Sequence, residues 1–413
     1  MAMDTTPQGE DGIDMLVGGF GPLNGQHSRG VERYRLVRGV GAPEDVALDH
    51  LGLLVPLASP TWLAREGDMV YAVLENTGEI ASLHLVRETG GWHAVIEGTV
   101  PVRGSGPTHA AVAVDDRGVR HLIAANYGDG SLSVHGMGAD GVVGAAEQWL
   151  EGEGGGPLPA QQGPHAHWVL PLPDGRVLST DLGADRIRVH RWSDGRLVRT
   201  GAVRLKPGTG PRDMHLLPTR SDDWRVAVVD EWGCGVTVLR GGAADGDDIR
   251  VVGTVDLGGD DADQAASLAY VPIGAGKVGD TVGGTAGDGI RGAVGYGAAT
   301  IGDGKVDGGA ASGGVASAEG FAYVGLRGSD RIVTLSWDGE SLTRLDHPWI
   351  AGWRGRGVSC GGGRPRQILA VDGLLVVCNE TSDSLAVMAV GADGEPRQVA
   401  SVDAPSPTVV LPL

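Results

Sequence analysis

The feature that most constrains the fold of this chain is a pattern of apolar strands that recurs at intervals of about 50 residues. Each copy has a proline or small residue, an apolar strand, a tight turn, a second apolar strand ending in a polar pair, and a third strand. Clear copies run through 60–85, 107–135, 164–192, 211–239 and 365–390, and looser copies lie at 15–34 and 266–325. Short strands with this spacing are typical of the blades of a β-propeller.

Seven copies predict an all-β fold, a seven-bladed β-propeller in which residues 1–413 form a single domain. The copy at 15–34 lacks a first strand, and the apolar segment 407–413 has no partner after it. We therefore expect the N- and C-terminal strands to pair and close the ring. A glycine-rich stretch at 274–318 interrupts the sixth copy, and we interpret it as a surface insertion inside the sixth blade.

Composition narrows the class of function. The 413 residues carry a formal net charge of −19, so we expect no binding to nucleic acid or to an anionic membrane. The three cysteines, Cys234, Cys360 and Cys378, have no disulfide or zinc spacing, which favours a reducing compartment. We find no pattern of a signal peptide and no apolar segment that would span a bilayer. The sequence predicts a cytoplasmic protein without a cofactor.

Candidate functional residues are expected on one rim of the central tunnel. In each hairpin the start of the first strand lies beside the end of the second, so the residues after each proline and the polar pairs should meet there. Strand alternation would put His165 and His167 on one face. Among the polar residues of this rim, eight from different blades are the predicted site residues: Asn126, His165, His167, Arg212, Glu231, Arg327, Arg366 and Glu380.

This set predicts a small-molecule site. Several arginines around one tunnel mouth would form a cationic well for an anionic ligand, and a glutamate or histidine beside them would act as a general base. Structural interpretations stay open. Arg212 with Glu231, and Arg366 with Glu380, could be inter-blade ion pairs. The two histidines could be structural or half of a metal site, but no third ligand has suitable spacing, so we predict no metal.

Several runs of residues resemble the lactonase family of seven-bladed β-propellers. They are A-N-Y-G-D-G-S from Ala125, G-P-H-A-H-W from Gly163, P-D-G-R from Pro173, D-L-G-A-D-R from Asp181, G-P-R-D from Gly210, and Asp230-Glu231. The resemblance extends from about Met15 to Leu413. Members of this family include propeller-type 6-phosphogluconolactonases and carboxy-cis,cis-muconate cyclases.

The resemblance implies a lactone-handling site with His167, Arg212, Glu231 and Arg327 as catalytic residues. His165, Asn126, Arg366 and Glu380 are then expected to bind the substrate. Three neighbours depart from the family pattern: Asp230 and Leu326 stand where asparagine is common, and Asp213 stands where histidine is common.

The function implied is hydrolysis of a sugar lactone such as 6-phosphogluconolactone, by base-activated water with arginines that anchor the anionic substrate. Two alternatives remain: a cyclase acting on a muconate-type dicarboxylate, and a non-catalytic propeller that serves as a binding module.

Overall fold

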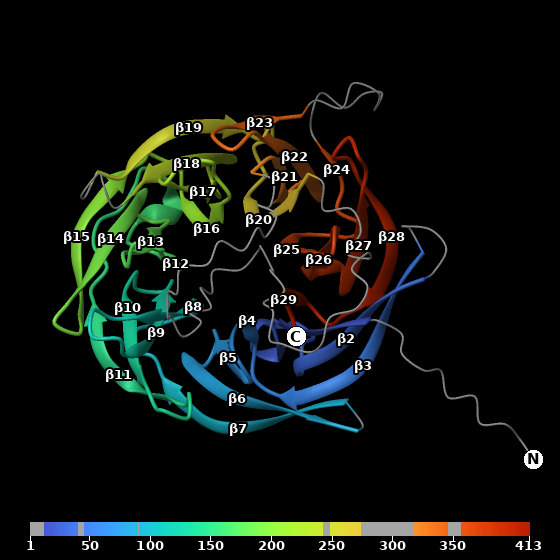
Figure 1. Ribbon diagram of the computed structural model, residues 1–413, viewed down its shortest axis with the longest axis horizontal. Coiled ribbons are helices and arrows are strands. Elements are labelled where there is room, and N and C mark those ends of the chain that lie inside the picture. Colours follow the sequence, from blue (N-terminus) through green and yellow to red (C-terminus); the bar gives the residue numbers. More distant parts are fainter. Residues whose placement is uncertain (1–11, 40–44, 90, 243–247, 274–317, 346–356) are drawn as a thin grey trace, which may run out of the picture.

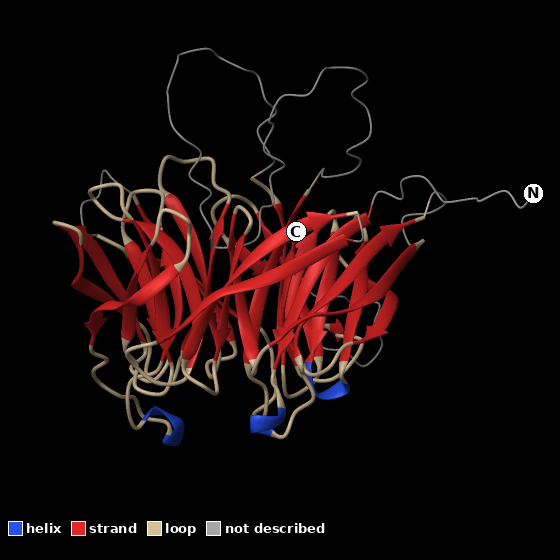
Figure 2. Cartoon of the chain, turned by 90° about the horizontal axis from the view of Figure 1, so that it is seen from below, coloured by secondary structure: helices blue, strands red, loops and turns tan. Residues whose placement is uncertain are grey.

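Seven β-sheets surround a central axis in this computed structural model, which describes residues 12–39, 45–89, 91–242, 248–273, 318–345 and 357–413 (Figure 1). Each sheet is a blade, and the predicted seven-bladed all-β propeller is confirmed. Among the described residues, three short 3-10 helices lie on one face of the ring: η1 (Pro22–Asn24), η2 (Pro159–Gln161) and η4 (Glu380–Ser382) (Figure 2). No helix among the described residues is long and apolar enough to cross a membrane.

Blades 2 to 7 follow one another along the chain, and each runs from an inner first strand to an outer last strand (Figure 1). Blade 2 contains β4 (Pro60–Glu66), β5 (Met69–Leu74), β6 (Glu79–Glu88) and β7 (Gly91–Pro101). Blade 3 contains β8 (Pro107–Val114), β9 (Arg120–Asn126), β10 (Leu132–Met137) and β11 (Val143–Leu150). Blade 4 contains β12 (Ala166–Pro171), β13 (Val177–Asp181), β14 (Arg186–Ser193) and β15 (Arg196–Arg204).

The remaining three of these blades have the same order. Blade 5 contains β16 (Pro211–Leu217), β17 (Trp224–Asp230), β18 (Gly235–Gly241) and β19 (Arg250–Asp256). Blade 6 contains β20 (Ala265–Pro272), β21 (Gly320–Leu326), β22 (Arg331–Trp337) and β23 (Leu342–Arg344), and β24 (Val358–Ser359) also pairs with β22. Blade 7 contains β25 (Pro365–Val371), β26 (Leu374–Asn379), β27 (Ser384–Val390) and β28 (Pro396–Asp403).

Blade 1 closes the ring by joining the two ends of the chain. Its order is β29 (Pro407–Pro412), β1 (Gly12–Gly19), β2 (Gly30–Arg38) and β3 (Val46–Pro56), so the last strand of the chain is the innermost one. β29 runs antiparallel to β1, with Leu411 opposite Leu16. The expected pairing of the terminal strands is therefore confirmed. It lets every blade pack between two neighbouring blades, so no sheet face is left uncovered at an end of the array and each sheet keeps only short, protected edges.

The closing sheet should contribute strongly to stability. Leu16 in β1 is fully buried, and we expect Leu16→Ala to lower the free energy of unfolding by about 2–5 kcal/mol, through lost burial and the cavity left behind. Urea denaturation followed by circular dichroism measures this change. Leu53→Ala in β3 of the same blade is the matched control, because Leu53 is 38% exposed and should cost less than about 1 kcal/mol. Equal losses in the two variants would contradict the prediction.

Strands β20 and β21 of blade 6 are neighbours in the sheet, although a long stretch of sequence lies between them. β20 and β21 pair directly, with Pro272 opposite Gly320. The glycine-rich stretch predicted as an insertion, 274–318, lies outside the described residues except for Ala318. Its interpretation as an insertion, and the single-domain organisation of the whole chain, remain predictions.

The rim predicted from the hairpins exists. Ala166 lies opposite Asp181, Pro211 opposite Asp230, and Pro365 opposite Asn379, so first strands begin where second strands end. In blades 2 to 7 the register between these two strands shifts close to this rim. Such irregularities redirect side chains locally. Residues that are distant in the sequence therefore lie around the same end of the central tunnel.

Candidate active site

A cavity of about 270 Å³ lies at this rim, and all seven blades contribute to its wall. Five of the eight predicted site residues line it: His167, Arg212, Glu231, Arg327 and Arg366. Asn126, His165 and Glu380 do not line it. The structure therefore brings together the four residues carried over as catalytic, together with one of the four expected to bind substrate.

Glu231 joins two arginines from neighbouring blades. Its Oε2 accepts a hydrogen bond from Nη1 of Arg212 at 3.0 Å, and its Oε1 lies 2.7 Å from Nη2 of Arg327. Burial raises the pKa of Glu231, but Arg327 and Arg212 outweigh it and hold that pKa below its usual value. Glu231 is therefore an ionised carboxylate that positions two guanidinium groups, and it is poorly suited to accept a proton.

A second carboxylate repeats this arrangement in blade 7. Oε2 of Glu380 lies 2.7 Å from Nε of Arg366 and 3.2 Å from Nε of Arg364, and both arginines line the cavity. Glu380 does not itself line the cavity, but it contacts and positions the two arginines that do. The two predicted ion pairs form, but Arg212–Glu231 and Arg366–Glu380 each lie within one blade and not between blades, because hairpin pairing already brings the partners together.

His167 is the buried imidazole of the cavity, with 6% of the residue exposed. Burial lowers its pKa well below the usual value, and the positive charges of Arg212 and Arg366 lower it further. Its Nδ1 lies 3.9 Å from Oδ1 of Asp213, which is too long for a hydrogen bond. His167 is therefore neutral at physiological pH and carries an unprotonated ring nitrogen able to accept a proton.

His165 does not share the position of His167. It precedes β12, and its ring stacks on Tyr127 with centroids 4.4 Å apart, while its Nδ1 is 2.7 Å from the Tyr127 carbonyl oxygen. The expectation of one common face is wrong, because alternation holds only within a regular strand and the register of β12 shifts between Ala166 and Val169. His165 supports Tyr127, which itself lines the cavity.

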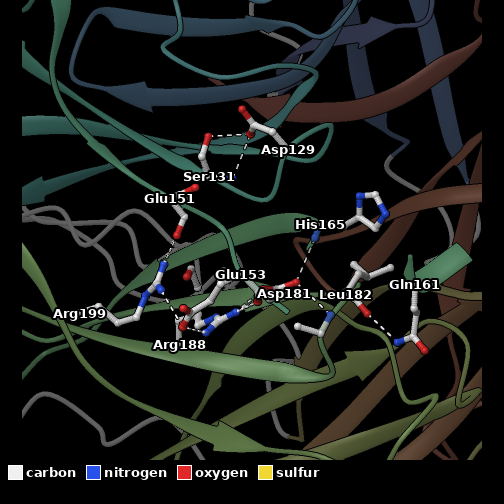
Figure 3. Close-up of polar contacts among 12 residues, drawn as sticks. Asp129, Ser131, Glu151, Glu153, Gln161, His165, Asp181, Leu182, Arg188 and Arg199 are labelled. Carbon is white, nitrogen blue, oxygen red and sulfur yellow. Dashed lines mark hydrogen bonds and ion pairs between the residues drawn. The ribbon is translucent and has the colours of Figure 1, made fainter. Parts of the chain in front are cut away.

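The segment that carries both histidines is anchored by a buried carboxylate (Figure 3). Oδ1 of Asp181 accepts a hydrogen bond from the His165 backbone N–H at 3.0 Å, and its Oδ2 accepts one from Nη2 of Arg188 at 2.7 Å. Arg188 also reaches Glu153, 3.1 Å from its Nη1, in the connection after β11 (Figure 3). This chain of contacts ties the start of β12 to the preceding blade and holds it in place.

Asn126 lies away from the cavity. It is fully buried, and its Nδ2 donates hydrogen bonds of 3.0 Å to the hydroxyl groups of Ser131 and Ser133. The amide is turned into the β9–β10 hairpin of its own blade. The residue that faces the cavity from this corner is the next one, Tyr127.

Three charged residues of the cavity were not among the predicted site residues: Glu75, Asp213 and Arg364. Glu75 follows β5 at the position equivalent to Glu231 and Glu380, because Pro60 lies opposite Leu74 as Pro211 lies opposite Asp230. The polar pair that begins at Glu75 was therefore its signal in the repeat. Arg364 immediately precedes β25, and it is neither a residue after the proline nor part of a polar pair, so the repeat did not mark it. With these residues, four arginines line the cavity, and four carboxylates (Glu75, Asp213, Glu231 and Glu380) line it or pair with those arginines.

The predicted cationic well is therefore wrong in one respect. If every carboxylate is ionised, the four positive charges are balanced by four negative ones. From that state the cavity becomes net positive when one of the carboxylates, or the neutral His167, takes up a proton. Among the described residues, no group of three or more histidines, cysteines or acids is placed to hold a metal ion.

Fold and site together define a seven-bladed propeller with a polar cavity at one rim of its central tunnel, and comparison with known proteins supplies the family. The family model described as "Lactonase, 7-bladed beta-propeller" matches residues 14–281, and the chain belongs to this family. Arg327, Arg364 and Arg366 lie beyond the matched residues. Their roles are therefore argued from the geometry of the cavity.

Individual relatives are distant. The 6-phosphogluconolactonase of Bacillus subtilis (strain 168) is 27% identical over 184 residues, covering 42% of this chain and 50% of the relative. The chain spans about half the length of the curated relatives it matches. Among solved structures, the periplasmic gluconolactonase of Pseudomonas aeruginosa has a TM-score of 0.70 at 21% identity, covering 98% of this chain and 99% of that one. A protein from Lactobacillus plantarum has a TM-score of 0.70 at 21% identity, covering 97% and 99%. These structures support the fold alone.

Proposed function

We propose that this protein hydrolyses a sugar lactone that carries an anionic group, with 6-phosphogluconolactone as the preferred candidate. The observation that carries the proposal is a neutral, buried histidine in one cavity with two arginine pairs, each pair held by its own glutamate. Membership of the lactonase family and the name of the Bacillus subtilis relative support the same class of substrate.

In the proposed reaction His167 is the general base. It takes a proton from a water molecule, whose oxygen attacks the lactone carbonyl carbon. His167 is favoured over Glu231 for this step, because the imidazole is neutral while the carboxylate is committed to Arg212 and Arg327. The oxygen of the tetrahedral intermediate becomes negative and would be stabilised by Arg212 and Arg327. Asp213 lies between the general base and the arginines: its Oδ1 is 3.9 Å from Nδ1 of His167 and 3.6 Å from Nε of Arg212.

The second arginine pair is proposed to bind the phosphate group of the substrate. Arg366 and Arg364 share Glu380, and guanidinium groups match phosphate oxygens in charge and geometry. We expect kcat/KM for 6-phosphogluconolactone to exceed that for unphosphorylated gluconolactone by about 10- to 100-fold, the effect of a charged hydrogen bond of about 1.5–3 kcal/mol. Initial rates above the spontaneous hydrolysis, measured with both lactones, give this ratio.

Arg366→Ala tests which arginines recognise the phosphate. The variant should lose most of the preference for the phosphorylated lactone through a higher KM, while its rate with gluconolactone changes little. A preference that survives in Arg366→Ala would contradict this assignment. Absence of hydrolysis of either lactone by the wild-type protein would contradict the proposed function itself.

The alternative is a cyclase, which forms a lactone from a muconate-type dicarboxylate instead of opening one. The same acid and base groups would then transfer a proton to or from a carbon atom of the substrate. Four arginines suit a dicarboxylate as well as a phosphate. A paired assay with 6-phosphogluconolactone and a carboxymuconate separates the two activities, and we expect turnover of the lactone only. As part of the same proposal we place the protein in the cytoplasm, in keeping with three cysteines that are all unbonded.

A further inference from the structure

Glu75 differs from the other acids of the cavity. Glu231 and Glu380 each contact two arginines, and Asp213 lies 3.6 Å from Arg212. Glu75 also lines the cavity, yet within the described residues no cation lies within 4.0 Å of its carboxylate. A carboxyl group at a cavity wall without an ion-pair partner is the one of the four that most readily changes its protonation state.

The surroundings of Glu75 explain its behaviour. Burial raises the pKa of Glu75 above its usual value, and the negative charge of Glu380 adds to this effect. Arg366, the Thr61 side chain and Arg212 act in the opposite direction but do not cancel the rise. Tyr127 also faces Glu75 and stays protonated, since burial raises the pKa of its hydroxyl.

We propose that Glu75 is the residue at which the cavity takes up a proton when an anion binds, and that this protonated carboxyl then donates to the leaving oxygen of the lactone. The first part follows from the charge balance of four arginines against four carboxylates. An entering anion meets a neutral cavity unless one carboxylate or His167 is protonated. Burial and the nearby arginines disfavour the protonated form of His167, and among the carboxylates the unpaired one loses least by accepting the proton. The second part rests on the proposed function.

The proton balance of the reaction is complete with these two residues. Water gives its proton to His167 and its oxygen to the carbonyl carbon. When the ring carbon–oxygen bond breaks, the electron pair stays on the ring oxygen, which takes the proton of Glu75 and becomes a hydroxyl. The carboxylic acid formed ionises to solvent. Transfer of the proton from His167 back to Glu75 through solvent restores the starting state. Opposite shifts of two titratable groups are the usual basis for dividing the roles of base and acid.

Sulfate tests the first part without depending on lactonase activity, because it remains a dianion throughout the neutral range. Isothermal titration calorimetry with sulfate, in buffers of different ionisation enthalpy, counts the protons taken up on binding. At a pH above the pKa of Glu75, the wild-type protein should take up close to one proton, and its apparent Kd should rise about tenfold per pH unit. Glu75→Gln should take up none and bind sulfate with an affinity independent of pH.

Glu79→Gln is the matched control for this titration. Glu79 begins β6 of the same blade and does not line the cavity, so its variant should behave as the wild type does. Equal proton uptake in wild type and Glu75→Gln would overturn the proposal, and so would sulfate binding by the wild type without uptake. Failure of sulfate to bind the wild type at all would overturn it as well.

The donor role has its own readout. Glu75→Gln should lower kcat for lactone hydrolysis by about 100-fold, because the leaving oxygen then departs without a proton. An unchanged kcat would overturn this role. If the wild type hydrolyses no lactone but still takes up a proton with sulfate, the proposed function fails and the assignment of Glu75 as the proton-accepting group stands.

Discussion

Replacing His167 by asparagine is expected to lower kcat/KM for 6-phosphogluconolactone by about 10²- to 10⁴-fold, the usual contribution of a general base. The expectation rests on a buried imidazole whose pKa burial lowers well below its usual value, so that the neutral form is available to activate water. Initial rates with the phosphorylated lactone, corrected for spontaneous hydrolysis, measure the loss. Circular dichroism and thermal unfolding establish that the variant is folded.

The chain offers a closely matched control. His165 lies two positions before His167 but stacks on Tyr127 outside the cavity, so His165→Asn should retain most of the activity. If both variants lose activity equally, or if His167→Asn remains as active as the wild type, His167 is not the base.

The pH profile provides a further check of this assignment. A histidine with a lowered pKa stays unprotonated as the pH falls, and the base is lost only when the pH passes below that lowered value. The acid limb of kcat/KM for the wild type should therefore lie below about pH 6.5, the ordinary pKa of imidazole. An acid limb above that pH would indicate a different base.

Arg212→Ala is expected to lower kcat/KM by about 10²- to 10³-fold with both phosphorylated and unphosphorylated lactones. Arg212 is proposed to stabilise the negative oxygen of the intermediate, which every lactone forms, and its loss also leaves Glu231 with Arg327 alone. The effect should appear mainly in kcat, because the charge develops after binding. Steady-state kinetics with the two lactones separates this outcome from that of Arg366→Ala.

Loss of a buried arginine can also destabilise the blade, and a control addresses this. Arg225 in β17 of the same blade is buried and paired with Glu340, but it does not line the cavity. Arg225→Ala should lower the temperature of unfolding while leaving kcat/KM nearly unchanged. If Arg212→Ala and Arg225→Ala lose activity in proportion to their loss of stability, the catalytic role of Arg212 is contradicted.

Much of the fold followed from local sequence signals. The repeat of apolar strands and polar pairs identified seven blades, and the unpartnered terminal segments identified the closing pair β29 and β1. Both predictions depend on hydrogen bonding between strands that lie next to each other in the ring. Even the long interval between β20 and β21 was recognised as lying within one blade, since those strands pair directly.

The candidate site was predictable only in part. Hairpin pairing correctly placed Arg212, Glu231 and Arg366 at one rim, because register is a local property. It failed for His165 and Asn126, whose side chains are turned away by a register shift and by hydrogen bonds within a turn. Whether a rim residue faces the cavity depends on a few backbone torsions, and alternation does not describe them.

The sequence by itself determined the blade repeat, the ring of seven, the closing strand pair and the level at which polar residues gather, because each depends on pairing between neighbouring segments. Only the tertiary structure decided the charge state of the cavity. Glu231 meets Arg327 across two blades, Glu380 binds Arg364 and Arg366, and in the described part of the chain no cation pairs with Glu75. Electrostatic interactions depend on distance and burial in three dimensions, which spacing along the chain does not specify.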